Sequence, residues 1–260
     1  MSSTELVLLA LKLAISAGVV VTASFIIERS GPLVGALIAS LPLSSGPIFV
    51  FLALEHGPEF LATTALGALP PMIGIAAFQY AYVRLAQRRR TLPAIAGALL
   101  VWAVVAEVVR ALHLPFALLA PLTIGAYLLA FRLVRPYLGW VASGALPRRW
   151  WDIPFRGFMV ALVTAISLLV GRLLGPGAAG LVALMPSVYV PLVLILQPRI
   201  GGRNTAAVLG IALPGMIGLT LGQIWIYLTA TWLGSAWALL GGGLISMGWN
   251  LGVLHVKRAR

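Results

Sequence analysis

Nine apolar stretches, each long enough to cross a lipid bilayer as a helix, dominate this sequence. Crossing about 30 Å of hydrocarbon takes roughly 20 helical residues. The stretches contain Gly and Pro and lack the alternating pattern of a membrane barrel strand, which favours helices. The nine predicted helices cover residues 5–27, 32–54, 60–83, 92–111, 115–134, 154–174, 177–197, 205–229 and 233–254.

The composition excludes a water-soluble globular domain. Of the 260 residues, 61% are hydrophobic and only 9% are charged, whereas about 25% are charged in an ordinary soluble domain. The chain has no cysteine, which excludes disulfides, thiolate metal sites and cysteine nucleophiles. The expected fold class is therefore an all-α polytopic membrane protein.

The basic residues predict how the helices face the membrane. When the nine helices are threaded alternately, 15 of the 18 Lys and Arg residues fall on one side. The positive-inside rule makes that side cytoplasmic, so the C-terminus is expected in the cytoplasm and the N-terminus outside. The membrane would be a plasma membrane or a bacterial inner membrane. Because this topology accounts for the net charge of +12, no nucleic-acid partner is expected.

The sequence contains an internal repeat. An offset of 144 residues aligns residues 31–79 with 175–223 without a gap and gives 16 identities in 49 positions. A biased composition alone would give roughly one match in ten, so duplication is the better explanation. The copies begin five predicted spans apart, and an odd separation predicts that they run through the membrane in opposite directions.

Two prolines interrupt the middle helix of each copy. Pro42 and Pro47 lie in the first copy, and Pro186 and Pro191 occupy the aligned positions of the second. Proline removes a backbone donor and clashes with the preceding turn, so both helices are predicted to break near mid-span. Unwound backbone at that depth must face protein or a water-filled cavity, where it can bind a ligand. The alternative is a pair of proline kinks in packed helices.

This order of elements resembles the core of bile acid sodium symporters and sodium/proton antiporters. In that fold, two inverted three-helix units each carry a broken middle helix, and the breaks cross at the substrate site. The resemblance rests on proline placement and repeat parity. It implies that helices one to three and six to eight form such units. No aspartate lies near either break, so the ion-site residues of that family have no counterpart here.

The repeat divides the chain into four parts. Residues 1–90 form the first repeat with helices one to three, and residues 91–151 hold helices four and five with a basic cytoplasmic loop. Residues 152–230 form the second repeat with helices six to eight, and residues 231–260 hold helix nine with a basic tail.

Several polar residues are candidate solute ligands because they lie at the breaks or deep inside spans. Those at the breaks can instead act as helix caps, and the glutamines can instead bond neighbouring helices. A lysine inside a span suggests a functional site or a side chain that extends to the interface. The candidates are Ser44, Ser45, Ser187, Tyr189, Gln79, Gln223 and Lys12.

Glu107 is the acid deepest in a predicted span and is a candidate for coupling transport to an ion. Its spacing from Arg110 equally fits a local ion pair. No catalytic motif, metal site or cofactor site is recognisable, and an enzyme is not expected.

The sequence thus predicts a secondary transporter of a small organic solute, with some preference for an anion, that works by alternating access. The alternative functions are a lipid-handling or scaffold protein and, third, an intramembrane lipid-modifying enzyme. The expected partners are the lipid bilayer and the solute, and a homodimer is compatible with the sequence.

Overall fold

The computed structural model describes residues 3–29, 45–139 and 151–258, and in these ranges the chain is helical without any strand. The first part of the predicted span 32–54 lies outside the described residues, as does the loop 140–150. The elements are α1 (Ser3–Arg29), α3 (Ser45–His56), α4 (Pro58–Gly67), α5 (Leu69–Leu85), α6 (Thr91–Ala111), α7 (Phe116–Val134), the short 3-10 helix η1 (Arg135–Tyr137), α8 (Asp152–Leu174), α9 (Pro176–Ala183), α10 (Tyr189–Leu233) and α11 (Ser235–Arg258).

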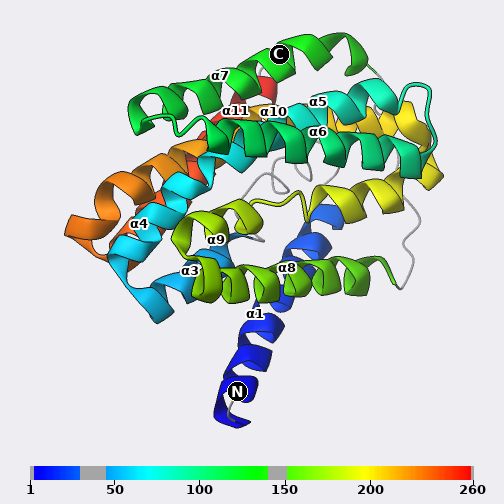
Figure 1. Ribbon diagram of the computed structural model, residues 1–260. Helices are drawn as coiled ribbons and strands as arrows, with labels where there is room; N and C mark the ends of the chain where they lie inside the picture. Colours follow the sequence, from blue (N-terminus) through cyan, green and yellow to red (C-terminus); the bar gives the residue numbers. More distant parts are fainter. Residues whose placement is uncertain (1–2, 30–44, 140–150, 259–260) are drawn as a thin grey trace.

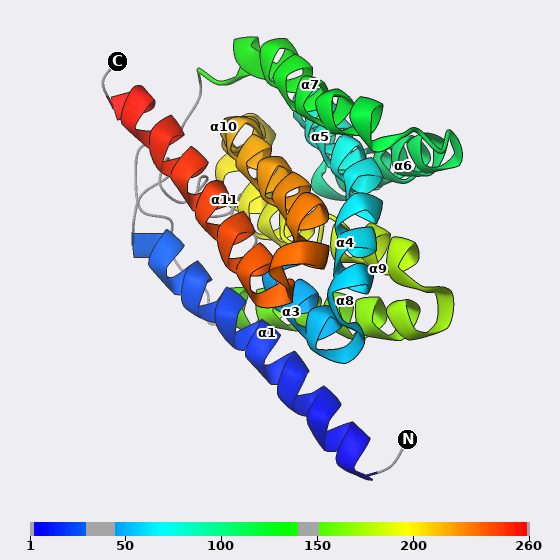
Figure 2. The same ribbon diagram turned by 90° about the vertical axis from the view of Figure 1, so that its left-hand side faces the viewer.

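Two helical segments form the centre of the molecule and the others surround them. Most residues of the segment Pro58–Leu85, which is α4 with α5, and of α10 are buried. Helix α6 packs on α5, α11 packs on α10, and α1 packs on α8. Figures 1 and 2 show α6 and α7 on one side of this centre and α1 on another.

The surrounding helices present apolar side chains outward. Large hydrophobic residues that are at least one-third exposed recur along them: Leu100, Val104 and Val108 on α6, Leu122 and Leu129 on α7, Leu162, Ile166 and Leu169 on α8, and Leu240, Leu244 and Leu251 on α11. Within the described residues, six segments are long and apolar enough to cross a membrane. A continuous apolar exterior of this kind fits an integral membrane protein.

Glycines with positive φ interrupt two of the long helical segments. Gly57, between α3 and α4, has φ 84° and ψ −174°, and Gly201, within α10, has φ 78° and ψ 163°. Only glycine adopts this region readily, because a Cβ atom would clash with the backbone. The predicted loop between residues 197 and 205 is therefore a single-residue kink, and helix continues on both sides of it.

Close backbone contact places α9 against the central segment. A Cβ atom at Gly180 would lie only 2.9 Å from the Ala68 backbone nitrogen, and one at Gly67 would lie 2.8 Å from the Gly177 Cα. Small residues allow helices to approach in this way. The crossing positions the chain after α9, residues 184–188, beside α5.

Helix α3 and the first part of α10 lead to opposite ends of the molecule. In Figure 1, α3 runs towards the left-hand end, where it turns into α4, and the yellow first part of α10 runs towards the right-hand end. At that right-hand end, Gln197 of α10 donates a hydrogen bond to the Arg89 carbonyl in the turn after α5, at 3.1 Å.

Candidate functional site

A small cavity lies where residues 184–188 pass between α3, α5 and α10. Its described lining combines the hydroxyl groups of Ser45 on α3 and Tyr189 at the start of α10 with apolar side chains from the two central segments. The lining residues are Ser45, Ile75, Ala183, Leu184, Met185, Pro186, Val188, Tyr189, Met216 and Leu219. The cavity volume is about 30 Å³, enough for roughly two water molecules and too little for an organic solute.

Proline explains why the chain is not helical at this place. Helix α9 ends at Ala183 and α10 starts at Tyr189, so Pro186 lies in the middle of five non-helical residues. A proline here cannot donate to the preceding turn. Pro191 is the third residue of α10, and Pro47 is the third residue of α3 as described. Proline is tolerated in a first helical turn because its missing N–H has no intrahelical partner there.

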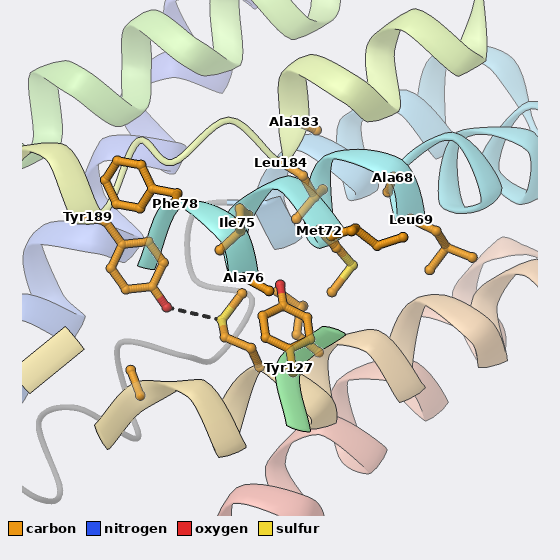
Figure 3. Close-up of a cluster of buried hydrophobic side chains, with 14 of the residues drawn as sticks. Ala68, Leu69, Met72, Ile75, Ala76, Phe78, Tyr127, Ala183, Leu184 and Tyr189 are labelled. Atoms are coloured by element: carbon orange, nitrogen blue, oxygen red, sulfur yellow. Dashed lines mark hydrogen bonds between the residues drawn. The ribbon is translucent and has the colours of Figure 1, made fainter. Parts of the chain in front are cut away.

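Ser45 and Tyr189 are the predicted site residues that line the cavity, and both are buried. The Tyr189 hydroxyl donates to the Met216 sulfur at 3.1 Å, and the Tyr189 ring lies 6.3 Å from the Phe78 ring, as Figure 3 shows. Ser187 lies between two lining residues; it is 3% exposed, and its hydroxyl has no hydrogen-bond partner within the described residues. Ser44 lies outside them.

Gln79 and Gln223 are buried one helical turn beyond the cavity. Gln79 follows the lining residue Ile75 by four positions on α5, and Gln223 follows Leu219 by four positions on α10. Helical side chains point back towards the N-terminus, which here is towards the cavity. Gln79 donates to the Leu209 carbonyl at 3.1 Å. The amide oxygens of both glutamines lack a partner in the part of the chain that is described.

The sequence reasoning missed Tyr127 of α7, which is completely buried next to this region. Its hydroxyl has no partner among the residues described, and it lies close enough to Tyr189 to interact with it electrostatically. No local sequence pattern distinguished Tyr127 from the apolar residues around it. The buried stripe of α7 repeats every three or four residues, and Tyr127 and Thr123 are its polar members.

Lys12 does not reach the cavity, because it pairs with Glu55 at the far end of α3. Arg172 of α8 binds the same carboxylate with two hydrogen bonds, at 3.1 and 3.2 Å. We call Lys12, Glu55 and Arg172 the Glu55 cluster. Glu55 is ten residues from Ser45, so the cluster lies roughly 15 Å along the helix from the cavity.

Glu55 follows the predicted span, and its charge state is set by this cluster. Burial raises the pKa of the Glu55 carboxyl, but the hydrogen bonds and positive charges of Arg172 and Lys12 outweigh burial, so the net shift is downward. The carboxyl is therefore ionised at neutral pH.

A second ion pair joins α8 to α10. Arg199 donates to Asp152 at 2.6 Å, and the two side chains are 14% and 3% exposed. We call this contact the Asp152–Arg199 pair. The sequence reasoning used Arg199 only as a marker of topology and did not identify Asp152, because the residues are 47 positions apart.

Glu107 lies on the exposed side of α6 and binds Arg110, which donates to it at 2.8 Å. It does not line the cavity. The described residues contain no group of His, Asp and Glu that can hold a metal ion.

The polar side chains among the described lining residues are therefore the hydroxyl groups of Ser45 and Tyr189. No family model, curated protein or solved structure matches the chain.

Proposed function

We propose that the chain is a secondary transporter of a small organic solute, which binds at the cavity between two inverted copies of a broken-helix unit. One observation carries the proposal. The lining residues Ser45 and Tyr189 are related by the repeat offset of 144, and so are Ile75 and Leu219. Both copies thus contribute equivalent positions to one cavity, as expected for a site on the axis between two repeats.

The backbone of the two segments supports the duplication. Gly57 and Gly201 are also related by the offset of 144, and their φ values differ by only 6°. Each kink follows a helical segment whose first described residue lines the cavity.

Contacts of the next helix extend the likeness beyond the aligned sequence. A Cβ atom at Gly74 would lie 2.9 Å from the Trp102 carbonyl of α6, and one at Gly218 would lie 3.0 Å from the Ser246 carbonyl of α11. Positions 102 and 246 again differ by 144. We therefore include α6 and α11 in the proposed copies, which leaves α7 as the connection between them.

The solute is proposed to bind through hydrogen bonds, with some preference for an anion. The described lining residues include no charged side chain. Helix α10 starts at the cavity with Tyr189, and a helix N-terminus carries partial positive charge. Between the described residues the cavity holds only water-sized molecules. Solute would enter after the two copies move relative to each other.

A counterflow screen tests the proposal. Proteoliposomes are loaded with organic anions, amino acids or neutral solutes, and uptake of the labelled solute is measured. Replacing Tyr189 by Phe removes one hydroxyl from the site and should weaken the affinity of the transported solute by about 1–2 kcal/mol, or roughly 5- to 30-fold.

Tyr227→Phe is the matched control, because Tyr227 packs on Phe116 away from the cavity. If no solute is exchanged and the purified protein transfers or retains lipid instead, the lipid-handling alternative replaces the transporter.

A further inference from the structure

Two groups of ion pairs lie at equal distances from the cavity. Glu55 follows Ser45 by ten residues along α3, and Arg199 follows Tyr189 by ten residues along α10. Each charged residue lies two positions before the positive-φ glycine of its segment. Because α3 and the first part of α10 run to opposite ends of the molecule, the Glu55 cluster and the Asp152–Arg199 pair lie at opposite ends (Figure 1).

Two of the charged positions in these groups are aligned, under the repeat, with residues of opposite charge. Glu55 aligns with Arg199, and Arg172, which binds Glu55, aligns with Glu28. Lys12 aligns with Arg156. Asp152, which binds Arg199, aligns with the uncharged Leu8, so the two groups share the aligned positions 55 and 199 but recruit different partners.

Both groups hold the helix that leaves the cavity against its neighbours. Lys12 and Arg172 connect α3 to α1 and α8, and Asp152 connects α10 to α8. The carboxylates are mostly shielded from water, with 13% of the Glu55 side chain and 3% of the Asp152 side chain exposed. Breaking a partly buried ion pair weakens the contact that holds its helix in place, so such pairs can bias a conformational equilibrium.

We propose that the Glu55 cluster and the Asp152–Arg199 pair are two latches, each of which closes one end of the cavity and is released in turn during alternating access. The proposal rests on the proposed transport function. It explains why the cavity is small in this structure, in which both latches are formed.

The test measures access to the cavity from each face separately. Since the chain has no cysteine, Ala183→Cys provides a single reporter in the cavity lining. A membrane-impermeant methanethiosulfonate is applied to right-side-out and inverted vesicles, whose orientation is read from a C-terminal tag. Glu55→Gln should raise the labelling rate from the face opposite the C-terminus, and Asp152→Asn should raise it from the C-terminal face.

Each increase should be at least about tenfold, the effect of a 1.4 kcal/mol shift in the equilibrium between closed and open states. Glu59→Gln is the matched control, because Glu59 is an exposed acid four residues from Glu55 and should leave labelling unchanged. The double exchange of Asp152→Arg with Arg199→Asp should restore slow labelling. If Asp152→Asn does not give a monodisperse protein, Arg199→Gln breaks the same pair.

Three results would overturn the latch proposal. The labelling rate could stay unchanged, it could rise equally from both faces, or the double exchange could fail to restore slow labelling. If the protein transports a solute in the counterflow screen but neither variant raises labelling from one face only, the latch proposal is rejected and the transport proposal stands. Sided opening without transport of any solute would reject the transporter and retain the latches as locks of a gated cavity.

Discussion

Replacing Tyr127 by Phe should affect protein stability and solute binding in opposite directions. Its buried hydroxyl has no partner in the described part of the chain. A buried hydroxyl without a hydrogen bond costs free energy, so Tyr127→Phe should leave the thermal unfolding midpoint in detergent unchanged or raise it. If the solute uses this hydroxyl, the same variant should lose part of the thermal shift that solute produces. A lowered midpoint without solute would show that the hydroxyl is already bonded.

Gln79 serves as an internal tie between the two central segments. Its amide donates to the Leu209 carbonyl across 130 residues of sequence, and its side chain is completely buried. Gln79→Leu removes this bond between the two segments and should lower the free energy of unfolding by about 0.5–1.5 kcal/mol. Gln87→Leu is the control, because the Gln87 amide donates to the Val83 carbonyl four residues earlier in the chain and not to the other central segment among the described residues. Equal losses in urea titrations of both variants would contradict a special role for Gln79.

Single residues were predictable from the sequence only where local chemistry determines their position. Pro186 lies among the non-helical residues 184–188 and Tyr189 lines the cavity, whereas a functional break and solute binding at Tyr189 remain predictions. Lys12 was predicted as a ligand because the sequence does not reveal that Glu55, 43 residues later, lies beside it. Tyr127 was missed because a tyrosine within an apolar run has no distinctive local pattern.

At the scale of helices, the two kinks depend on glycine. Gly57→Ala and Gly201→Ala each force a Cβ atom into a backbone region that side chains avoid, although nothing lies within 4 Å of either position. The cost is conformational, of order 1–3 kcal/mol, and should appear as a lower unfolding midpoint. Gly125→Ala is the control, because Gly125 lies in regular helix with open space and should be neutral or stabilising. An unchanged unfolding midpoint in Gly201→Ala would show that the kink in α10 does not depend on glycine.

Helix positions followed well from hydropathy where a helix is bounded by polar turns. The predicted spans 92–111, 115–134 and 154–174 match α6, α7 and α8 to within two residues. Hydropathy failed where helix continues through polar residues. Arg203 and Asn204 were assigned to a loop, yet they lie in α10 after the kink, with Asn204 bonded to the Ile200 carbonyl at 2.7 Å. A loop and a one-residue kink have the same composition, and only the backbone distinguishes them.

For the whole molecule, the sequence predicted an all-helical membrane protein, and the described residues agree in being helical with six apolar segments of spanning length. The inverted arrangement of the copies and the number of nine spans remain predictions. They depend on whether an odd or an even number of spans separates two given loops, and the Lys and Arg residues in those loops indicate on which side of the membrane each loop lies.

The distribution of basic residues over the two ends makes the parity testable. The turn after α5 holds Arg88, Arg89 and Arg90, and Gln197 connects this turn to the kink of α10 near Arg199. The turn between α6 and α7, residues 112–115, contains neither Lys nor Arg. Short cytoplasmic loops carry an excess of Lys and Arg, so the end of the molecule that holds the turn after α5 should lie in the cytoplasm.

Reporter fusions after Arg90, Trp151 and Arg260 should all report cytoplasm, and an insertion between His113 and Leu114 should report the outside. An external signal after Arg260 would make the number of spans after Arg90 odd, whereas the proposed topology has six. The two copies would then no longer be inverted as proposed.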